Sequence, residues 1–536
     1  MTAMENFDAI VVGAGATGAV YAHELTRAGM NVLGIEKGNF FQNHRTDFVE
    51  NELEMFRLVW DYSDYQITGN AFDGGPNLGA HVGGGTLAWT ATALRMFAHD
   101  FRFRSTFGNV SGANLADWPI NKKVLQPYYA LAEQQMGVSG DATWWDELST
   151  PLPPNPPIPL YPASRAIQRG FDQLGMRSSP GRVATNSQTY RGRSACLNCG
   201  YCRSGCRVDA KYQADEVLIK PALATGRLQL VTRSVVTRIE TDRSGTEARS
   251  VKYTNLDTGR ESSARARFII LCNNPFEIPR LLLVSTSRRH PNGIGNHYDQ
   301  IGRNFYSHAS CLGMGISSDD HRTYVGHSMC NVMSLDTCVN RERKDYVGGF
   351  SMLSLNGAGA GSLAAFPLHK IHGLDLQQRM TQYNNSMVLI TFIEGMPVYD
   401  NRISVNRKKT DALGMPVPTV HYNWHENDRR AFNHASEKIA QVLEAAGAYE
   451  SFTSDIFESH PMGTMRMGNN PKTSATDRFC RVHGVSNLYV AGGCLYPTGS
   501  SVNPTLTMHA LALRSTRKII KQWCKPFSGV LVEIES

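Results

Sequence analysis

Residues 7–18 read FDAIVVGAGATG, an apolar run followed by three closely spaced glycines. The apolar run predicts a β-strand over Phe7–Val12, and the apolar spacing of Ala19–Ala28 predicts a helix. A second apolar run, Val32–Ile35, predicts another strand and is followed by Glu36. A strand, a G-x-G-x-x-G turn, a helix and a strand that ends in an acid form the unit that binds dinucleotides. The sequence therefore predicts an α/β domain with a nucleotide site near its N-terminus.

Each residue of this turn has a physical role in such a site. Gly13 allows the sharp turn, Gly15 lets the backbone approach a pyrophosphate, and Gly18 lets the helix pack closely on the strand. The helix start, where Thr17 lies, offers N–H groups and positive potential to the phosphates. We expect Glu36 to accept hydrogen bonds from the adenosine ribose. The turn alone does not distinguish FAD from NAD.

Composition limits the class of protein. The 536 residues carry a net charge of +7 and are 41% hydrophobic, which fits a globular protein of two or three units. We find no basic run with interleaved aromatic residues, so nucleic acid is not expected as a partner. No stretch approaches the roughly 18–20 apolar residues of a membrane helix. Glu5 and Asp8 replace the basic start of a signal peptide, so we expect folding in the cytoplasm.

The remainder of the chain alternates strand-like and helical segments. Gly69–Gly85 is rich in glycine and Pro151–Pro162 is rich in proline, so both are expected to be loops. Strands are predicted over Leu228–Ile239, Phe268–Cys272 and Ser486–Val490, and helices over Leu125–Met136, Arg429–Ala446 and Pro504–Lys518.

Four separate segments, in this order, resemble the glucose–methanol–choline flavin oxidoreductases. They are the glycine turn, Val82–Thr86 (VGGGT), Ser459–Thr464 (SHPMGT) and Asn503–Thr507 (NPTLT). Within that family the chain is most similar to the sugar-oxidising branch that includes pyranose 2-oxidase, gluconate dehydrogenase and bacterial glucoside 3-dehydrogenase. The segments that carry this closer similarity are Asp117–Ile120, Pro127–Tyr129 and Gly137–Gly140.

The resemblance implies a mixed α/β fold: a Rossmann-like FAD-binding domain with an interleaved, sheet-based substrate-binding domain. We expect the FAD-binding domain to comprise residues 1–300 and 456–536, and the substrate-binding domain residues 301–455. The first would include a flavin loop (69–95), the proline-rich connection (151–162) and a cysteine-rich loop (190–210).

By the same resemblance, further residues contact FAD: Gly84, Gly85, Thr86, Val236, Gly493, Pro504 and Thr505. A backbone without side chains, such as the glycine run before Thr86, can lie against the flat isoalloxazine. In pyranose 2-oxidase, the equivalent segment carries a histidine that bonds covalently to the flavin, just before a Trp-Thr pair. Here Ala88 precedes Trp89 and Thr90, so we expect FAD to be bound without a covalent link.

The resemblance assigns the chemistry to His460 and Asn503. Oxidation of an alcohol requires removal of the hydroxyl proton, and histidine, with an ordinary pKa of about 6.5, is suited to accept it near neutral pH. Asn503 can donate a hydrogen bond to the substrate oxygen. The alternatives are a structural role for His460 and a turn-forming role for Asn503 before Pro504.

Cys196, Cys199, Cys202 and Cys206 have the spacing C-x2-C-x2-C-x3-C. This spacing matches a ferredoxin-type ligand run, although Arg207 stands where a proline is customary. We therefore predict a 3Fe-4S or 4Fe-4S cluster, ranked above a zinc site and a disulfide-linked loop.

A flavin and a one-electron cluster in one chain predict a dehydrogenase that passes electrons to a partner. The resemblance to the sugar-oxidising branch implies that the reaction oxidises a ring hydroxyl of a sugar or glycoside, with carbon 3 favoured over carbon 2. The family includes enzymes with a small subunit and a cytochrome c, and export with a signal-bearing small subunit follows by analogy. The alternatives are an oxygen-using sugar oxidase, a gluconate-type 2-dehydrogenase and a non-enzymatic flavin subunit.

Overall fold

The computed structural model describes residues 5–52, 57–58, 64–71, 78–143, 145, 151–357, 359–365 and 371–524. Residues 72–77 of the predicted flavin loop lie outside the described residues, as do residues 1–4 and 525–536 at the ends of the predicted FAD-binding domain.

The first sheet contains the predicted nucleotide-binding unit. Its parallel strands are β5 (Leu228–Val231), β2 (Val32–Ile35), β1 (Glu5–Val12), β8 (Glu261–Leu271) and β17 (Leu488–Val490). The antiparallel strands β7 (Ala248–Asn255) and β6 (Ser234–Thr241) continue from β8. β7 pairs with the first half of β8 and β17 with its last three residues, so β8 has two successive partners on one side.

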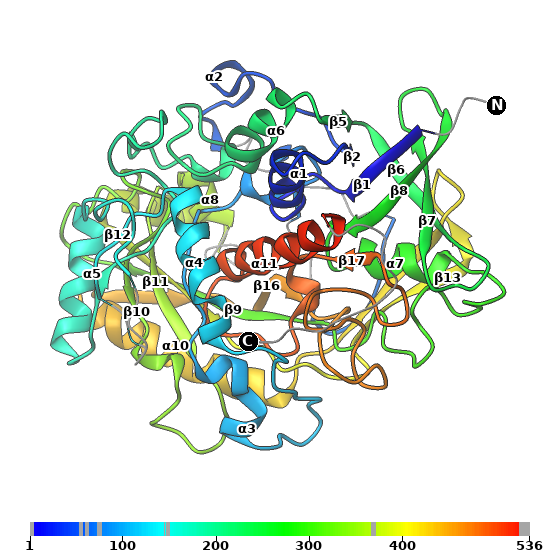
Figure 1. Ribbon diagram of the computed structural model, residues 1–536. Coiled ribbons are helices and arrows are strands. Elements are labelled where there is room, and N and C mark those ends of the chain that lie inside the picture. Colours follow the sequence, from blue (N-terminus) through cyan, green and yellow to red (C-terminus); the bar gives the residue numbers. More distant parts are fainter. Residues whose placement is uncertain are drawn as a thin grey trace.

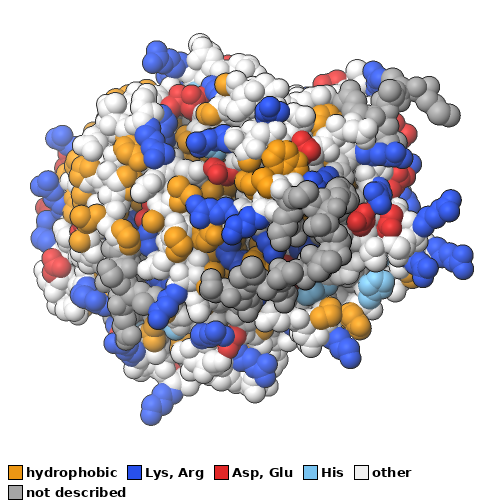
Figure 2. Space-filling view, viewed as in Figure 1, with side chains coloured by type: hydrophobic (Ala, Val, Ile, Leu, Met, Phe, Trp, Pro, Cys, Tyr) orange, Lys and Arg blue, Asp and Glu red, His pale blue; other side chains and the backbone are white. Residues whose placement is uncertain are grey.

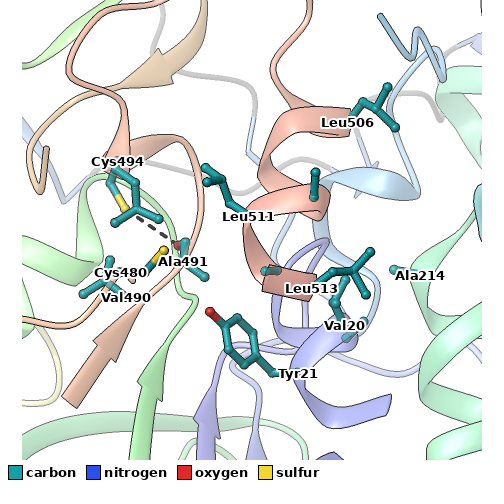
Figure 3. Close-up of a cluster of buried hydrophobic side chains, with 14 of the residues drawn as sticks. Val20, Tyr21, Ala214, Cys480, Val490, Ala491, Cys494, Leu506, Leu511 and Leu513 are labelled. Carbon is teal, nitrogen blue, oxygen red and sulfur yellow. Dashed lines mark hydrogen bonds between the residues drawn. The ribbon is translucent and has the colours of Figure 1, made fainter. Parts of the chain in front are cut away.

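Helices cover this sheet and bring distant parts of the chain together. α1 (Gly18–Arg27) follows β1 directly and packs against α11 (Thr505–Trp523), which packs in turn against α4 (Lys122–Met136) (Figure 1). Figure 3 shows the apolar contact that results: Val20 and Tyr21 of α1 lie near Leu511 and Leu513 of α11. Residues from both ends of the chain therefore share one buried core.

The second sheet is antiparallel. It is formed by β15 (Glu450–Thr453), β9 (Tyr306–Ile316), β12 (Ser386–Ile393), β11 (Phe350–Leu355), β10 (Met329–Ser334) and β4 (Ser179–Pro180), with β16 (Phe457–Met462) also paired to β9. α5 (Pro162–Gln173) and α10 (Glu426–Ala445) pack on it. Every residue of β9, β10 and β12 is buried.

The remaining elements are short. A third sheet consists of β13 (Arg402–Thr410), β14 (Pro416–Tyr422) and β3 (Gln66–Gly69). The other helices are α2 (His44–Asp47), α3 (Phe103–Phe107), α6 (Lys220–Ala224), α7 (Glu277–Val284), α8 (Ala360–Ala365) and α9 (Gly373–Thr381). On the face shown in Figure 2, basic side chains form several separate groups.

The predicted fold class is confirmed, and most predicted elements differ from the observed ones by only a few residues at their ends. One prediction was wrong in detail: the single strand over Leu228–Ile239 is two strands, β5 and β6. The break lies at Arg233, whose φ of +51° turns the chain from the edge beside β2 to the antiparallel edge. The domain boundaries stay a prediction, since β4 and β16 of the second sheet lie outside 301–455.

Candidate active site

A cavity of about 910 Å³ lies where the glycine turn, the flavin loop, β16 and the start of α11 meet. It is lined by most of the predicted cofactor and catalytic residues: Gly13, Gly15, Thr17, Glu36, Gly84, Gly85, Thr86, Val236, His460, Gly493, Asn503, Pro504 and Thr505. Such a volume is in the range of cofactor sites. The structure thus gathers these residues around one space, although they are distributed over the whole chain.

Gly18 lies beneath the cavity. A Cβ atom there would lie 1.9 Å from the carbonyl oxygen of Gly13 and 3.3 Å from the Cβ of Cys272. Only glycine therefore allows α1 to pack this closely on the turn. Cys272 stands immediately after β8, so this tight packing also fixes how the end of β8 approaches the turn.

The flavin loop touches the nucleotide turn directly. The N–H of Gly83 donates to the carbonyl oxygen of Ala14 over 2.9 Å, and a Cβ on Gly84 would lie 2.7 Å from the Cα of Gly15. Gly84 also has a φ of +53°, which residues with a side chain rarely adopt. The two glycine segments, far apart in sequence, form one continuous wall.

Polar groups on the cavity wall fit a dinucleotide. The buried carboxylate of Glu36 accepts hydrogen bonds from the backbone N–H groups of Ala14 and Gly38, each over 2.8 Å. Three residues that line the cavity each have a buried oxygen atom without a hydrogen-bond partner among the described residues. These atoms are Thr92 Oγ1, Asn273 Oδ1 and Asn503 Oδ1. Buried polar atoms are normally satisfied, so these three are suited to a polar ligand.

His460 projects into the cavity from an irregular part of β16. The pairing of β16 with β9 shifts between Ser459 and Met462, and His460 itself has a φ of +57°. A bulge of this kind redirects a side chain. The imidazole Nε2 lies 3.3 Å from the amide nitrogen of Asn503, and Nδ1 lies 3.0 Å from Nδ1 of His308. His460 and Asn503, 43 residues apart, are therefore within hydrogen-bond distance.

Burial sets the protonation state of His460. Loss of water lowers its pKa well below the ordinary value, and the neighbouring His308 lowers it further. The imidazole is therefore neutral at neutral pH and can accept a proton.

Asn503 and Pro504 lie at the start of α11, with Thr505 as its first residue. The helix runs 19 residues, and its first turn faces the cavity through Thr505 and Met508. The unpaired N–H groups of a helix start carry partial positive charge. This end of the cavity therefore favours negative charge.

The four clustered cysteines border the same cavity from another side. The four cysteines do not line the cavity themselves. Residues between or beside them do: Gly200, Tyr201, Arg203 and Ser204. Cys199 is exposed, and none of the four forms a disulfide. This structure therefore shows no disulfide in the cysteine loop.

The cysteine loop is joined to the flavin loop by Lys211. This buried ammonium donates to the carbonyl oxygens of Leu87, Trp89 and Cys202, over 2.7, 3.1 and 2.6 Å. Burial alone would raise the pKa of Cys202, but His327 and the charge of Lys211 together lower it to about 6. The cysteine loop is thus held firmly beside the flavin loop.

The sulfur atoms fit zinc poorly. Tetrahedral zinc with Zn–S bonds of about 2.3 Å needs sulfur atoms about 3.8 Å apart. Within the described part of the chain, no three of these sulfur atoms all lie within 4.8 Å of one another. An iron–sulfur cluster binds each thiolate at a different iron and accepts a wider spread. The cluster nonetheless stays a prediction.

The sequence matches the two family profiles of the GMC oxidoreductases, over residues 7–310 and 397–512. The chain belongs to the GMC oxidoreductase family. It is therefore an FAD-dependent enzyme that acts on CH–OH groups, and the resemblance drawn from its motifs is confirmed.

Relatives of this GMC oxidoreductase span nearly its whole length. The fructose dehydrogenase large subunit of Gluconobacter japonicus is 28% identical over 96% of this chain and 97% of its own. The 2-methyl-1,2-propanediol dehydrogenase of Mycolicibacterium austroafricanum is 28% identical over 96% of this chain and 95% of its own. The crystal structure of pyridoxine 4-oxidase from Mesorbium loti has a TM-score of 0.66 at 18% identity, covering 95% and 98% of the two chains.

The site of this GMC oxidoreductase also contains residues that the sequence did not indicate. His308 on β9 contacts the predicted base, yet no motif surrounds it and its strand is apolar. Arg203 faces the cavity from the cysteine loop. Only the antiparallel pairing of β9 with β16 reveals His308, and only the path of the cysteine loop reveals Arg203.

Among the described helices, none has both the length and the hydropathy needed to cross a bilayer.

Proposed function

We propose that this enzyme oxidises a ring hydroxyl of a sugar or glycoside to a ketone, with carbon 3 favoured over carbon 2, and uses non-covalently bound FAD. The observation that carries the proposal is the approach of His460 Nε2 to the Asn503 amide, 3.3 Å apart on the wall of the cavity. Similarity to the fructose dehydrogenase large subunit over 96% of the chain supports a sugar as substrate.

The two residues divide the work on the hydroxyl group. His460 accepts the hydroxyl proton at Nε2, since burial keeps the imidazole neutral and a neutral imidazole has one ring nitrogen free to accept. The amide of Asn503 donates to the same oxygen as negative charge develops on it. The flavin, when bound, supplies the acceptor for the hydride that leaves the carbon. Loss of one proton and one hydride converts the alcohol to a ketone.

The cavity residues account for how FAD is held. The start of α1 and the turn at Gly13–Gly18 would hold the pyrophosphate, and Glu36 and Val236 would contact the adenosine. The segment Gly84–Thr86 would lie against the flavin. Ala88 lines the cavity and has no nucleophilic atom, which supports a non-covalent cofactor.

Electrons are proposed to leave through an iron–sulfur cluster held by Cys196, Cys199, Cys202 and Cys206. Such a cluster transfers electrons singly to an external carrier. The cysteine loop borders the flavin cavity and is tied to the flavin loop by Lys211, while Cys199 reaches the surface. We propose that a smaller subunit and a cytochrome c, or a similar carrier, accept the electrons there.

One observation favours a second substrate class. Arg203 is among the residues that line the cavity, and a guanidinium pairs well with a carboxylate. A sugar acid of the gluconate type would provide that carboxylate.

The test is anaerobic purification, measurement of FAD and iron, and electron paramagnetic resonance, followed by titration with neutral sugars, glycosides and sugar acids. We expect bound FAD, iron near cluster stoichiometry, bleaching by a neutral sugar, and a 3-keto product by NMR. Absence of iron with rapid oxygen consumption would instead identify an oxidase. Absence of reduction by every sugar and sugar acid would contradict the proposal.

A further inference from the structure

His308 lies on β9, fully buried, and faces the catalytic histidine across the pair of strands β9 and β16. We propose that His308 is a positioning residue that fixes which ring nitrogen of His460 carries the proton, so that Nε2 always faces the substrate as an acceptor. This inference rests on the proposed function and adds to it a residue outside the motifs.

The hydrogen-bond chain allows one arrangement of protons. Nε2 of His308 lies 2.6 Å from the carbonyl oxygen of Ser500, and a carbonyl oxygen can only accept. Nε2 of His308 must therefore carry the proton. A neutral imidazole carries a single ring proton, so Nδ1 of His308 is an acceptor. The group that faces it, 3.0 Å away, is Nδ1 of His460, which must donate. The remaining nitrogen of His460, Nε2, is then unprotonated.

The imidazole rings of His308 and His460 are both neutral, as this series of hydrogen bonds requires. Burial lowers the pKa of His308 to about 4, although the Ser500 carbonyl and the nearby charge of Asp100 act in the opposite direction. The pKa of His460 is lowered by burial and by His308. A proton on His308 Nδ1 would place two N–H groups opposite each other, which the geometry disfavours.

The orientation of the Asn503 amide is compatible with this assignment. Its nitrogen, a donor, is the atom 3.3 Å from His460 Nε2, so the contact is favourable only if Nε2 is unprotonated. The Ser500 carbonyl requires this tautomer, and the contact with Asn503 is compatible with it.

Ser500, at the other end of this series of hydrogen bonds, is itself held in place. The Ser500 hydroxyl donates to a carboxylate oxygen of Asp100 over 2.6 Å, and the N–H of Phe97 donates to the same oxygen over 2.7 Å. This holds the Ser500 carbonyl in place for His308. The rings of His308 and His460 meet edge to face, with centroids 5.0 Å apart and planes at 83°. His460 lies at a bulge, where the regular pairing of β16 with β9 is interrupted. The contact with His308 therefore helps to hold the His460 ring in place.

Three variants separate proton placement from simple packing. His308→Leu removes both hydrogen bonds while it keeps an apolar side chain in the core. His308→Asn keeps an oxygen acceptor near the position of Nδ1. Ser310→Ala is the matched control, because the Ser310 hydroxyl bonds that of Ser459 over 2.7 Å between the same strands without contact to the imidazole chain.

The first measurement is the steady-state kinetics of the FAD-loaded enzyme with the sugar identified in the titration and an artificial electron acceptor. We expect His308→Leu to lower kcat about 10- to 100-fold, the effect of one or two buried hydrogen bonds, with KM changed less than about threefold. His308→Asn should recover most of kcat, and Ser310→Ala should match the wild type. An unchanged kcat in His308→Leu, or an equal loss in Ser310→Ala, would overturn the inference.

The second measurement observes the proton itself. Nitrogen NMR of protein labelled in its histidine rings, with the His460 signal identified by its loss in His460→Gln, should show Nδ1–H in the wild type and a tautomer mixture in His308→Leu. An unaltered His460 tautomer in His308→Leu would overturn the inference. If His460→Gln itself reduces the flavin normally, the proposed function fails instead, so the two failures are distinguishable.

Discussion

The Nε2 atom of His460 and the amide nitrogen of Asn503 lie 3.3 Å apart, although one residue is on β16 of the second sheet and the other lies just before α11. A proton acceptor and a hydrogen-bond donor therefore converge on one small region of the cavity wall. A single oxygen atom of a substrate can contact both.

Replacement of Asn503 tests the donor half of this pair. Asn503→Ala should lower the rate of flavin reduction by about 10²–10³-fold, because the charge that develops on the substrate oxygen loses its donor. Asn503→His, which retains a ring N–H, should recover part of the rate. Stopped-flow reduction under anaerobic conditions measures both. Equal losses in the two variants would indicate that the donor is not what matters at this position.

The pH dependence of reduction follows from the lowered pKa of His460. The unprotonated imidazole is the active form, and its pKa lies well below 6.5 because of burial and the neighbouring His308. The value of kcat/KM should therefore stay level from neutral pH to below pH 6.5, and fall only in more acidic solution. A fall that begins above pH 7 would mean that the base titrates as an exposed histidine does.

Two glycines of the flavin loop should respond differently to alanine. A Cβ on Gly84 would lie 2.7 Å from the Cα of Gly15, so Gly84→Ala should disturb the protein with or without FAD. A Cβ on Gly85 would meet no protein atom within 4 Å, yet Gly85 lines the cavity. Gly85→Ala should therefore leave the melting temperature of the apoprotein unchanged and weaken FAD binding. Unchanged FAD affinity in Gly85→Ala would show that the flavin does not lie against this residue.

Removal of Cys202 tests the proposed cluster. Cys202→Ser should lower bound iron and slow electron transfer to an external one-electron acceptor, while anaerobic reduction of the flavin by substrate continues, because the base and the donor are unchanged. Cys524→Ser is the control, since Cys524 is a single exposed cysteine near the C-terminus. Iron content and acceptor-linked activity measure the effect. Equal iron in wild type and Cys202→Ser would contradict cluster ligation by this loop.

The sequence was sufficient for the nucleotide-binding part of the fold. The first 36 residues contain a strand, a glycine turn, a helix and a strand in immediate succession, and each is local. Local patterns of this kind are what periodicity detects. The proposed catalytic pair was predicted from its motifs, and the structure shows that His460 and Asn503 line the same cavity.

Other features depend on contacts between distant segments, which periodicity does not detect. The break at Arg233 arises because β5 must join β2 while β6 joins β7. His308 could not be identified, since a histidine in an apolar strand is more often structural than functional. Its role depends on the register of β9 against β16, which places His308 opposite Ser459.

The central claim is that His460 removes the substrate proton beside a bound flavin. The most direct measurement is anaerobic mixing of a sugar substrate that reduces the flavin with the purified wild type and with His460→Gln, both loaded with FAD. Loss of the flavin absorbance should be about 10²–10⁴-fold slower in His460→Gln, the usual contribution of a general base, with the FAD content of the two proteins equal. Reduction at the wild-type rate in His460→Gln would contradict the account.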